Sequence, residues 1–367
     1  MSGKRLFFSW CIFATLIASS FSSCEMPSAV TSARSVPALP RAVYIVNSLA
    51  ETVSVLDPAT KTLYSDVILT GKYPNAVVPW DGNLYVVNSG DNNVQVYREA
   101  DYSLLKTIAL GSNRNPWTII IDSDRNKGYV PNFMKGTVSV IDLGTYAVIK
   151  EITVGAGPEG GCYLNGRVYV GNTAYSSGTG KFAEGKISVI DTTTDAVVAT
   201  VSVEAAGWTS AENGANPQSL IALPSLNQVH VVCTGVNGGT GSDDGEVVVL
   251  DVSSAAPVVS GRLPIGGSPV VSADGANTAS GLVYLAGVGG ITTYAASPLV
   301  VDHPSSAYLF DATSSGFLSG AAYDSVNGVL VVTDYNNDNI LIIDPGSGAV
   351  LKTIRGSDGP QTPVIFS

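Results

Sequence analysis

The pattern of apolar and polar residues repeats along the chain. Four runs share a tyrosine, a β-branched residue and, after one variable residue, an asparagine: Tyr44-Ile-Val-Asn47, Tyr85-Val-Val-Asn88, Tyr129-Val-Pro-Asn132 and Tyr169-Val-Gly-Asn172. Three more divergent copies follow: His230-Val-Val-Cys233, Tyr284-Leu-Ala-Gly287 and Val331-Val-Thr-Asp334. The first residues of the seven runs are 41, 44, 40, 61, 54 and 47 positions apart. This period is typical of four-stranded β-propeller blades.

A second apolar strand follows in most units and ends at an aspartate. Its clear copies are Val53-Ser-Val-Leu-Asp57, Val138-Ser-Val-Ile-Asp142, Ile187-Ser-Val-Ile-Asp191, Val247-Val-Val-Leu-Asp251 and Ile340-Leu-Ile-Ile-Asp344. The aspartate opens a turn of the form Asp-x-x-Thr or Asp-x-x-Ser. Because an aspartate there can accept a backbone N–H two residues on, we interpret these carboxylates as structural.

Two further strands complete the unit. The run 147–154 alternates polar and apolar residues, as a half-exposed outer strand does. A glycine and a proline then lead into another apolar run, such as 118–122. The first unit lacks this Gly-Pro-led strand, and residues 359–366 supply it at the other end of the chain. The pattern therefore predicts an all-β fold: a single seven-bladed β-propeller of four-stranded blades, with the ring closed by the C-terminal strand.

The sixth unit deviates most from the pattern. Gly289-Gly290 is expected to turn directly into the strand Ile291-Thr-Thr-Tyr294. The stretch Pro298–Ser305 is then expected to be a short connection before Ala307-Tyr-Leu-Phe-Asp311.

These repeats resemble the YVTN family of seven-bladed propellers, and the resemblance extends from Val43 to Ser367. The later units depart from the motif, because Cys233, Gly287 and Asp334 stand where the asparagine is expected. Proteins of this family are often found in the cell envelope or at the cell surface, so the resemblance implies such a setting.

The N-terminal segment has the features of a bacterial export signal. Lys4 and Arg5 precede an apolar stretch that is too short and too polar to cross a bilayer comfortably. Phe21-Ser22-Ser23-Cys24 resembles a lipobox, in which Cys24 is lipidated and becomes the mature N-terminus; an ordinary cleaved signal is the alternative. We expect a signal peptide over 1–23, a lipidated tether over 24–40 and the propeller over 41–367. The protein would then be lipid-anchored in the envelope, on the periplasmic side of the outer membrane or at the cell surface.

Composition removes several function classes. The 367 residues include 30 acidic and 19 basic side chains, for a net charge of −11, and only 2 histidines. This balance argues against a nucleic-acid partner, and it leaves little for histidine-based catalysis or transition-metal binding. Cys162 and Cys233 are expected to be buried thiols in different repeats, with a disulfide as the alternative.

Three insertions interrupt the regular spacing in units four and five. They are Thr173–Lys186, Glu204–Asn216 and Thr234–Glu246. In a propeller all three loops emerge on one face, which indicates a binding surface on a rigid scaffold. Drift in surface loops is the alternative explanation. The candidate binding residues in these loops are Tyr175, Phe182, Trp208, Asp243, Asp244 and Glu246.

Other sites are weaker candidates. The three carboxylates of the third insertion can hold calcium, although they lack the alternating spacing of a calcium loop. A ring of residues at equivalent strand ends is expected at the mouth of the central channel, either as turn caps or as a site for a small polar ligand or metal. Its members are Asn47, Asn88, Asn132, Asn172 and Asp334.

The sequence contains no recognisable catalytic constellation. It has no Gly-x-Ser-x-Gly motif, His230 occupies a tyrosine position in a strand, and His303 is expected in a connection. We therefore expect a monomeric binding or scaffold protein without a cofactor, whose ligand is a protein, a glycan or a small molecule. A lactonase-like or other hydrolase using the central channel is the alternative, by analogy with other seven-bladed propellers.

Overall fold

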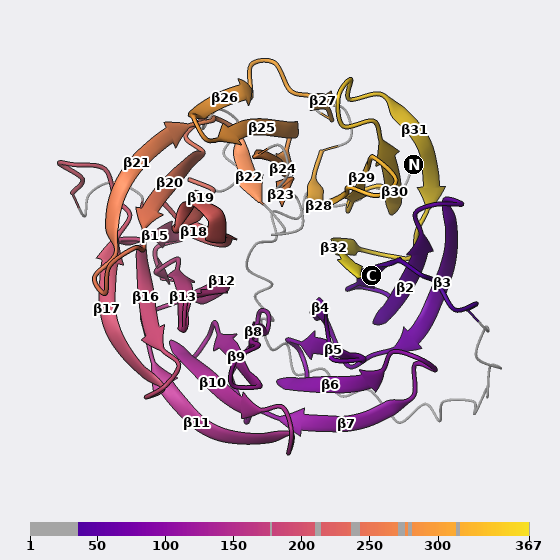
Figure 1. Ribbon diagram of the computed structural model, residues 1–367, viewed down its shortest axis with the longest axis horizontal. Helices are drawn as coiled ribbons and strands as arrows, with labels where there is room; N and C mark the ends of the chain where they lie inside the picture. Colours follow the sequence, from indigo (N-terminus) through magenta and orange to yellow (C-terminus); the bar gives the residue numbers. More distant parts are fainter. Residues whose placement is uncertain are drawn as a thin grey trace.

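The computed structural model describes residues 36–176, 178–209, 214–235, 243–270, 276–277, 281–312 and 316–366. Seven antiparallel sheets surround a central axis in chain order (Figure 1). The all-β seven-bladed prediction is confirmed. Within the described residues, no helix is long and apolar enough to cross a membrane.

The first four blades have four strands each, ordered from the axis outward. Blade 1 contains β32 (Pro360–Phe366), β1 (Ala42–Asn47), β2 (Thr52–Asp57) and β3 (Thr62–Leu69). Blade 2 contains β4 (Pro74–Trp80), β5 (Asn83–Asn88), β6 (Asn93–Arg98) and β7 (Leu104–Ala109). Blade 3 contains β8 (Ile120–Asp122), β9 (Lys127–Asn132), β10 (Thr137–Asp142) and β11 (Ala147–Thr153). Blade 4 contains β12 (Pro158–Leu164), β13 (Arg167–Asn172), β16 (Lys186–Asp191) and β17 (Ala196–Ser202).

The last three blades follow the same order. Blade 5 contains β18 (Pro217–Leu223), β19 (Gln228–Cys233), β20 (Glu246–Asp251) and β21 (Val258–Pro264), with a short 3-10 helix at Pro224–Leu226. Blade 6 contains β22 (Ser268–Val270), β24 (Leu282–Val288), β25 (Gly290–Ala296) and β26 (Leu299–His303), joined by β23 (Ala276–Asn277) and β27 (Phe310–Asp311). Blade 7 contains β28 (Leu318–Asp324), β29 (Val329–Asp334), β30 (Asn339–Ile343) and β31 (Val350–Arg355).

The C-terminal strand closes the ring, as predicted. Strand β32 pairs antiparallel with β1, with Tyr44 opposite Val364 and Asn47 opposite Pro360. The two strands lie side by side in Figure 1, yellow against indigo. Blade 1 therefore combines strands from the N-terminal and the C-terminal end of the repeats. This pairing leaves no inner strand with an unpaired edge where the two ends meet.

The sixth blade corrects one sequence expectation. Strand β25 does follow directly from Gly289-Gly290, as predicted. The prediction of a connection at Pro298–Ser305 is wrong, because most of this stretch forms β26, which pairs with β25. His303 therefore ends an outer strand rather than lying in a loop. The β-branched residues of β26 complete the blade, and β27 pairs with the other end of β25.

The predicted aspartate turns are also present. The Asp57 carboxylate accepts N–H bonds from Ala59 at 3.0 Å and Thr60 at 3.4 Å. The Thr60 hydroxyl donates back to Asp57 at 2.6 Å. Asp191 and Asp344 make the corresponding backbone contacts. These carboxylates therefore stabilise the hairpin between the two outer strands of their blades.

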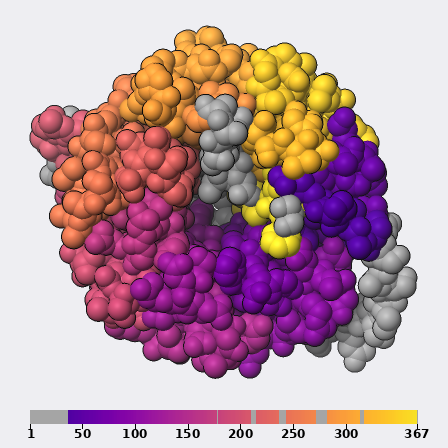
Figure 2. Space-filling view, viewed as in Figure 1, coloured from indigo at the N-terminus to yellow at the C-terminus, as the bar shows by residue number. Residues whose placement is uncertain are grey.

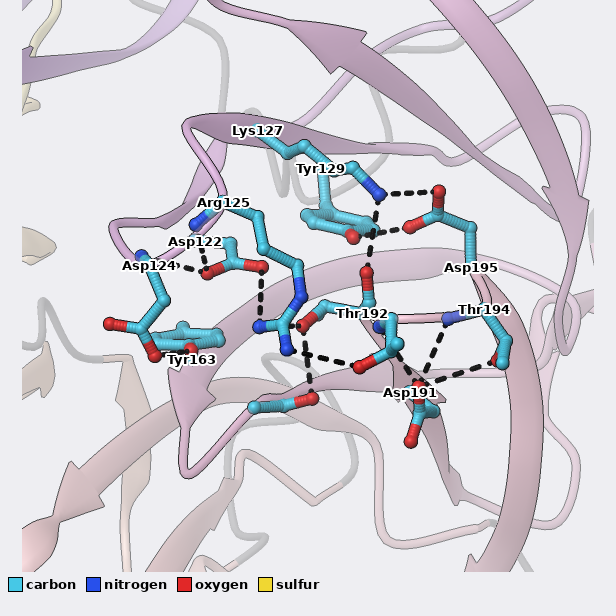
Figure 3. Close-up of polar contacts among 12 residues, drawn as sticks. Asp122, Asp124, Arg125, Lys127, Tyr129, Tyr163, Asp191, Thr192, Thr194 and Asp195 are labelled. Atoms are coloured by element: carbon cyan, nitrogen blue, oxygen red, sulfur yellow. Dashed lines mark hydrogen bonds and ion pairs between the residues drawn. The ribbon is translucent and has the colours of Figure 1, made fainter.

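In two of the blades the repeated tyrosine links its blade to the next. The Tyr44 hydroxyl donates to Glu99 in blade 2 at 2.8 Å. The Tyr129 hydroxyl donates to Asp195 in blade 4 at 2.5 Å, and Lys127 pairs with the same carboxylate at 2.7 Å (Figure 3). Burial and the Asp195 carboxylate both raise the pKa of Tyr129. The hydroxyls of Tyr44 and Tyr129 therefore hold neighbouring blades together.

Arg125 strengthens the same boundary between blades 3 and 4. Its guanidinium donates to the hydroxyls of Thr192 at 3.1 Å and Thr193 at 3.0 Å (Figure 3). His230 fills the tyrosine position of blade 5, where its Nδ1 lies 2.9 Å from the Tyr294 hydroxyl of blade 6. The interpretation of His230 as a packed substitute for tyrosine is thus confirmed.

Candidate functional site

Three inserted segments lie at the same end of blades 4 and 5. The first connects β13 to β16 and contains a small hairpin of β14 (Tyr175–Ser176) and β15 (Lys181–Phe182). The second connects β17 to β18, and the third connects β19 to β20. In Figure 1 the segment following β17 reaches outward beyond the ring. Figure 2 shows the blades packed around a central opening.

The first two insertions are joined by Glu204. Its carboxylate accepts the backbone N–H of Gly185 at 2.6 Å and of Ala215 at 2.9 Å. The Gly214 N–H also donates to the Phe182 carbonyl at 2.9 Å. A carboxylate that accepts two backbone N–H groups makes charge-assisted bonds, which are stronger than neutral ones. The two loops therefore form one supported unit.

Arg262 connects this unit to the third insertion. Its guanidinium donates to the Val203 carbonyl at 2.7 Å and to the Glu204 carbonyl. It also pairs with Glu246 at 2.7 Å. Burial raises the pKa of Glu246, and the neighbouring arginine opposes that rise. Glu246, a predicted binding residue, is thus engaged in positioning the loops.

The predicted aromatic residues differ in exposure. Tyr175 and Phe182 face each other across the β14–β15 hairpin, with ring centroids 5.2 Å apart and the ring planes tilted by 57°. Phe182 is only 6% exposed, whereas Tyr175 and Trp208 are half-buried. Of the three predicted aromatic residues, Tyr175 and Trp208 are therefore the ones that a partner can reach. Phe182 supports the hairpin from beneath.

The predicted acidic residues Asp243 and Asp244 differ in their surroundings. Asp243 accepts the Gly267 N–H and the Ser305 hydroxyl, each at 2.5 Å, and these bonds lower the pKa of its carboxyl. Asp244 is exposed next to it. In the described part of the chain, no three His, Cys, Asp or Glu side chains are grouped to hold a metal ion. The calcium expectation therefore gains no support from this geometry.

The predicted channel-mouth residues are buried one strand back from the axis. Asn47 donates its Nδ2 to Thr52 at 2.9 Å and Ser54 at 2.8 Å on the next strand of its own blade. Asn88, Asn132 and Asn172 make similar bonds within their blades. Asp334 accepts from the Asn337 amide at 2.9 Å. The side-chain Nδ2 atoms of the four asparagines are therefore engaged within the blades, whereas their Oδ1 atoms are buried without a hydrogen-bond partner among the described residues.

The innermost strands carry polar residues that the sequence pattern did not reveal as a set. They stand one place after the first residue of the strand, at Asn75, Glu159, Gln218, Ser319 and Gln361. Glu159 is 1% exposed, and its Oε2 has no hydrogen-bond partner among the described residues. Burial raises the pKa of Glu159 well above its usual range, although a Thr173 hydrogen bond acts in the opposite direction.

Gln218 occupies the equivalent place in the next blade. Its Oε1 is likewise buried without a partner in the described part, while its Nε2 donates to Asn216 at 3.3 Å. The two innermost strands approach closely, since a Cβ on Gly160 would lie 2.2 Å from the Gln218 carbonyl. A glycine is therefore required where these blades meet. In the sequence, the paired glycines of Pro158-Glu159-Gly160-Gly161 are the feature that indicates this close approach of the two strands.

The remaining candidates have structural surroundings. His303 Nδ1 lies 2.9 Å from the Thr293 hydroxyl and 3.0 Å from the Asp302 carboxylate. Cys162 and Cys233 are both buried and free, which confirms the preferred interpretation. Burial raises the pKa of both thiols, so neither is an activated nucleophile.

Comparison with known proteins supports the fold. No protein-family model matches the chain, and no curated protein matches it by sequence. A crystal structure of a protein from Lactobacillus plantarum is 16% identical over 89% of this chain and 99% of its own, with a TM-score of 0.60. Hydrazine synthase from Kuenenia stuttgartiensis is 17% identical over 79% of this chain and 88% of its own, also at 0.60. A functionally unknown protein from Desulfotomaculum acetoxidans is 12% identical, covers 88% and 98%, and reaches 0.63.

Similarity at this level of identity establishes architecture alone. The chain is a seven-bladed β-propeller, and its three connected insertions form a loop cluster at one end of blades 4 and 5.

Proposed function

We propose that this protein is a lipid-anchored envelope protein of the YVTN type, whose propeller presents the loop cluster of blades 4 and 5 to a binding partner. One observation carries the binding role: three separate insertions are cross-connected by Glu204 and Arg262. Loops that had only drifted in length would not need half-buried charged groups to hold them together. The proposed contact residues are Tyr175, Trp208, Asp243 and Asp244.

The chain enters the propeller at the end opposite the loop cluster. Arg41, just before β1, pairs at 2.8 Å with the buried Asp324 carboxylate, which ends innermost strand β28. The insertions follow the outgoing ends of β13, β17 and β19, at the other end of the blades. An anchor at Cys24 would therefore leave the loop cluster facing away from the membrane. Cys24 itself lies outside the described residues.

Replacement of two loops tests the binding role. Residues 174–184 and 235–245 are exchanged for short turns with the sequence Ser89-Gly-Asp-Asn-Asn93, which joins the equivalent strands in blade 2. Thermal unfolding should show a folded protein, because shortening a surface loop changes closure entropy by only about 1 kcal/mol. Partners captured from envelope extract by the wild type should be lost. The matched control is a variant with substitutions at residues 90–92, in the β5–β6 turn of blade 2 on the same face. It should capture the same partners as the wild type.

Undiminished capture by the folded double-loop variant would disprove the assignment of the binding face. The anchor is tested separately with Cys24→Ala, which should move the protein from membranes to the soluble fraction. Continued sedimentation with membranes after a high-salt wash would contradict lipidation. A panel of lactones and esters examines the hydrolase alternative directly, and we expect no saturable turnover.

A further inference from the structure

Tyr73 has an unusual backbone conformation for its residue type and its place in the ring. It precedes Pro74, the first residue of β4, and its φ is +49°. In blades 1, 3, 4 and 5 the residue before the corresponding proline also has a positive φ, but it is a glycine or an asparagine. These residues are Gly359, Asn115, Gly157 and Asn216. Glycine and asparagine tolerate the left-handed region, whereas a bulky residue before a proline is strained there, and such strain is typical of functional positions.

The Tyr73 ring lies on the turn between β5 and β6. A Cβ on Gly90 would be 2.7 Å from the Cδ2 atom of the ring, so a glycine is required beneath it. The Tyr73 carbonyl accepts the Ser89 backbone N–H at 3.0 Å and the Ser89 hydroxyl at 2.8 Å. The side chain is nevertheless 39% exposed. Tyr73 is therefore held in place at its backbone while part of its ring faces solvent.

The surface continues from this turn into blade 3. Asn92, in the same turn, accepts the backbone N–H of Asn115 at 2.9 Å. The Asn115 carbonyl in turn accepts the backbone N–H of Phe133 at 3.1 Å. The rings of Phe133 and Trp117 are half-buried, with centroids 6.1 Å apart. Three aromatic residues thus follow a connected series of turns on the face that also carries the loop cluster.

The charged side chains of these turns are nearly balanced. Arg114 pairs with Glu151 at 2.5 Å. The Asp91 carboxylate accepts the backbone N–H of Lys72 at 2.9 Å, which places one acidic side chain beside one basic residue. Lys135 adds one further positive charge in the turn between β9 and β10. Because the balance leaves no strong field of either sign, the surface suits an uncharged ligand better than a polyanion or a polycation.

We infer that Tyr73, Trp117 and Phe133, here called the aromatic strip, bind a neutral β-1,4-linked glycan. In glucose and N-acetylglucosamine units with this linkage the ring substituents are equatorial, so each sugar presents flat C–H faces. Weakly positive C–H groups pack favourably on the negative face of an aromatic ring. The strip lies over blades 2 and 3, apart from the loop cluster of blades 4 and 5, so this site goes beyond the proposed function.

Calorimetric titration of the full protein with cellohexaose and with chitohexaose tests the inference. The wild type should bind at least one of them with a dissociation constant on the order of 0.1–1 mM. Tyr73→Asn introduces the residue type of blades 3 and 5 and should weaken binding at least 10-fold. The same variant should unfold about 1–3 °C higher, because the backbone strain is relieved. A purely structural tyrosine would give the opposite result, a lower midpoint on substitution.

Two control variants keep the strip intact. Tyr73→Phe retains the ring and should bind like the wild type, as should Tyr175→Ala in the loop cluster. The loop-replacement variant should also still bind the hexasaccharide. Its control with substitutions at residues 90–92 loses Gly90, so it should keep the partners of the loop cluster but bind the hexasaccharide more weakly. Failure of the loop-cluster proposal is thereby distinguishable from failure of this inference.

No binding of either hexasaccharide at up to about 10 mM would overturn the inference. Undiminished binding by Tyr73→Asn, or a lowered unfolding midpoint of that variant, would overturn it as well. Aromatic surfaces also bind proline-rich segments. Binding of decaproline that Tyr73→Asn abolishes, without binding of a hexasaccharide, would assign the strip to such segments and reject the glycan.

Discussion

Glu159 offers the most informative perturbation of the propeller. At the equivalent place in β4, the Asn75 amide donates to the Pro116 carbonyl of the next blade at 3.3 Å. In β28, the Ser319 hydroxyl donates to the Pro360 carbonyl at 2.7 Å. A carboxylate has no proton to donate there, whereas a carboxylic acid does. We therefore expect Glu159 to be protonated in the folded protein at neutral pH.

The sign of the pH effect follows from the raised pKa. Between the unfolded pKa of about 4.3 and the higher folded pKa, the folded state holds a proton that the unfolded state has released. Stability then falls as pH rises through this window, by up to about 1.4 kcal/mol per pH unit. Glu159→Gln has the same shape and supplies N–H donors without ionising. At pH 7 it should be more stable than the wild type by up to about 4 kcal/mol, the proton-linkage free energy that accumulates between the unfolded pKa and pH 7.

Denaturant unfolding of wild type and Glu159→Gln between pH 4 and pH 8 measures the effect. The two curves should approach each other near pH 4 and separate as pH rises. Glu51→Gln, in the turn between β1 and β2, controls for the loss of one negative charge elsewhere in the fold. A constant difference at all pH values, or a Glu159→Gln variant destabilised at pH 7, would refute the neutral-acid reasoning.

Three further predictions test the ring and its blade boundaries. Deletion of residues 362–367 should lower the thermal midpoint severely or prevent folding, because β1 loses its paired inner neighbour; an unchanged midpoint would contradict closure. Tyr129→Phe should cost about 1–2 kcal/mol in chemical denaturation through its lost bond to Asp195, whereas Tyr169→Phe, whose hydroxyl has no carboxylate partner among the described residues, should cost less. Burial lowers the pKa of His230 to about 4, so stability should fall as pH drops from about 6.5 to 4. His230→Tyr should remove that dependence of stability on pH. An unchanged pH profile in this variant would show that another group is responsible.

Much of the fold was predictable because it depends on local periodicity. Alternating apolar residues, the Asp-x-x-Thr turns and the spacing of the Tyr-Val strands are short-range patterns, and each blade repeats them. Strand β26 was missed since it is short and ends in Asp302-His303, which resembles a polar connection. Its partner β25 supplies the pairing that makes it a strand.

The candidate site was predictable only in part. Unusual loop lengths marked the three insertions, but Phe182 and Glu246 proved to be supports for the loops. Glu204, which joins two insertions, gave no local indication of its role, since an acidic residue in a loop is ordinarily solvated.

The sequence by itself determined the number of blades, their strand order and the closure of the ring, because these follow from a repeated pattern and from strand pairing. Only the tertiary structure decided which polar groups are buried and what they contact. Tyr129 meets Asp195 across 66 positions, and Glu204 meets Gly185 across 19. Burial and hydrogen bonding depend on neighbours that the ring brings together from different blades, and no local pattern encodes those neighbours.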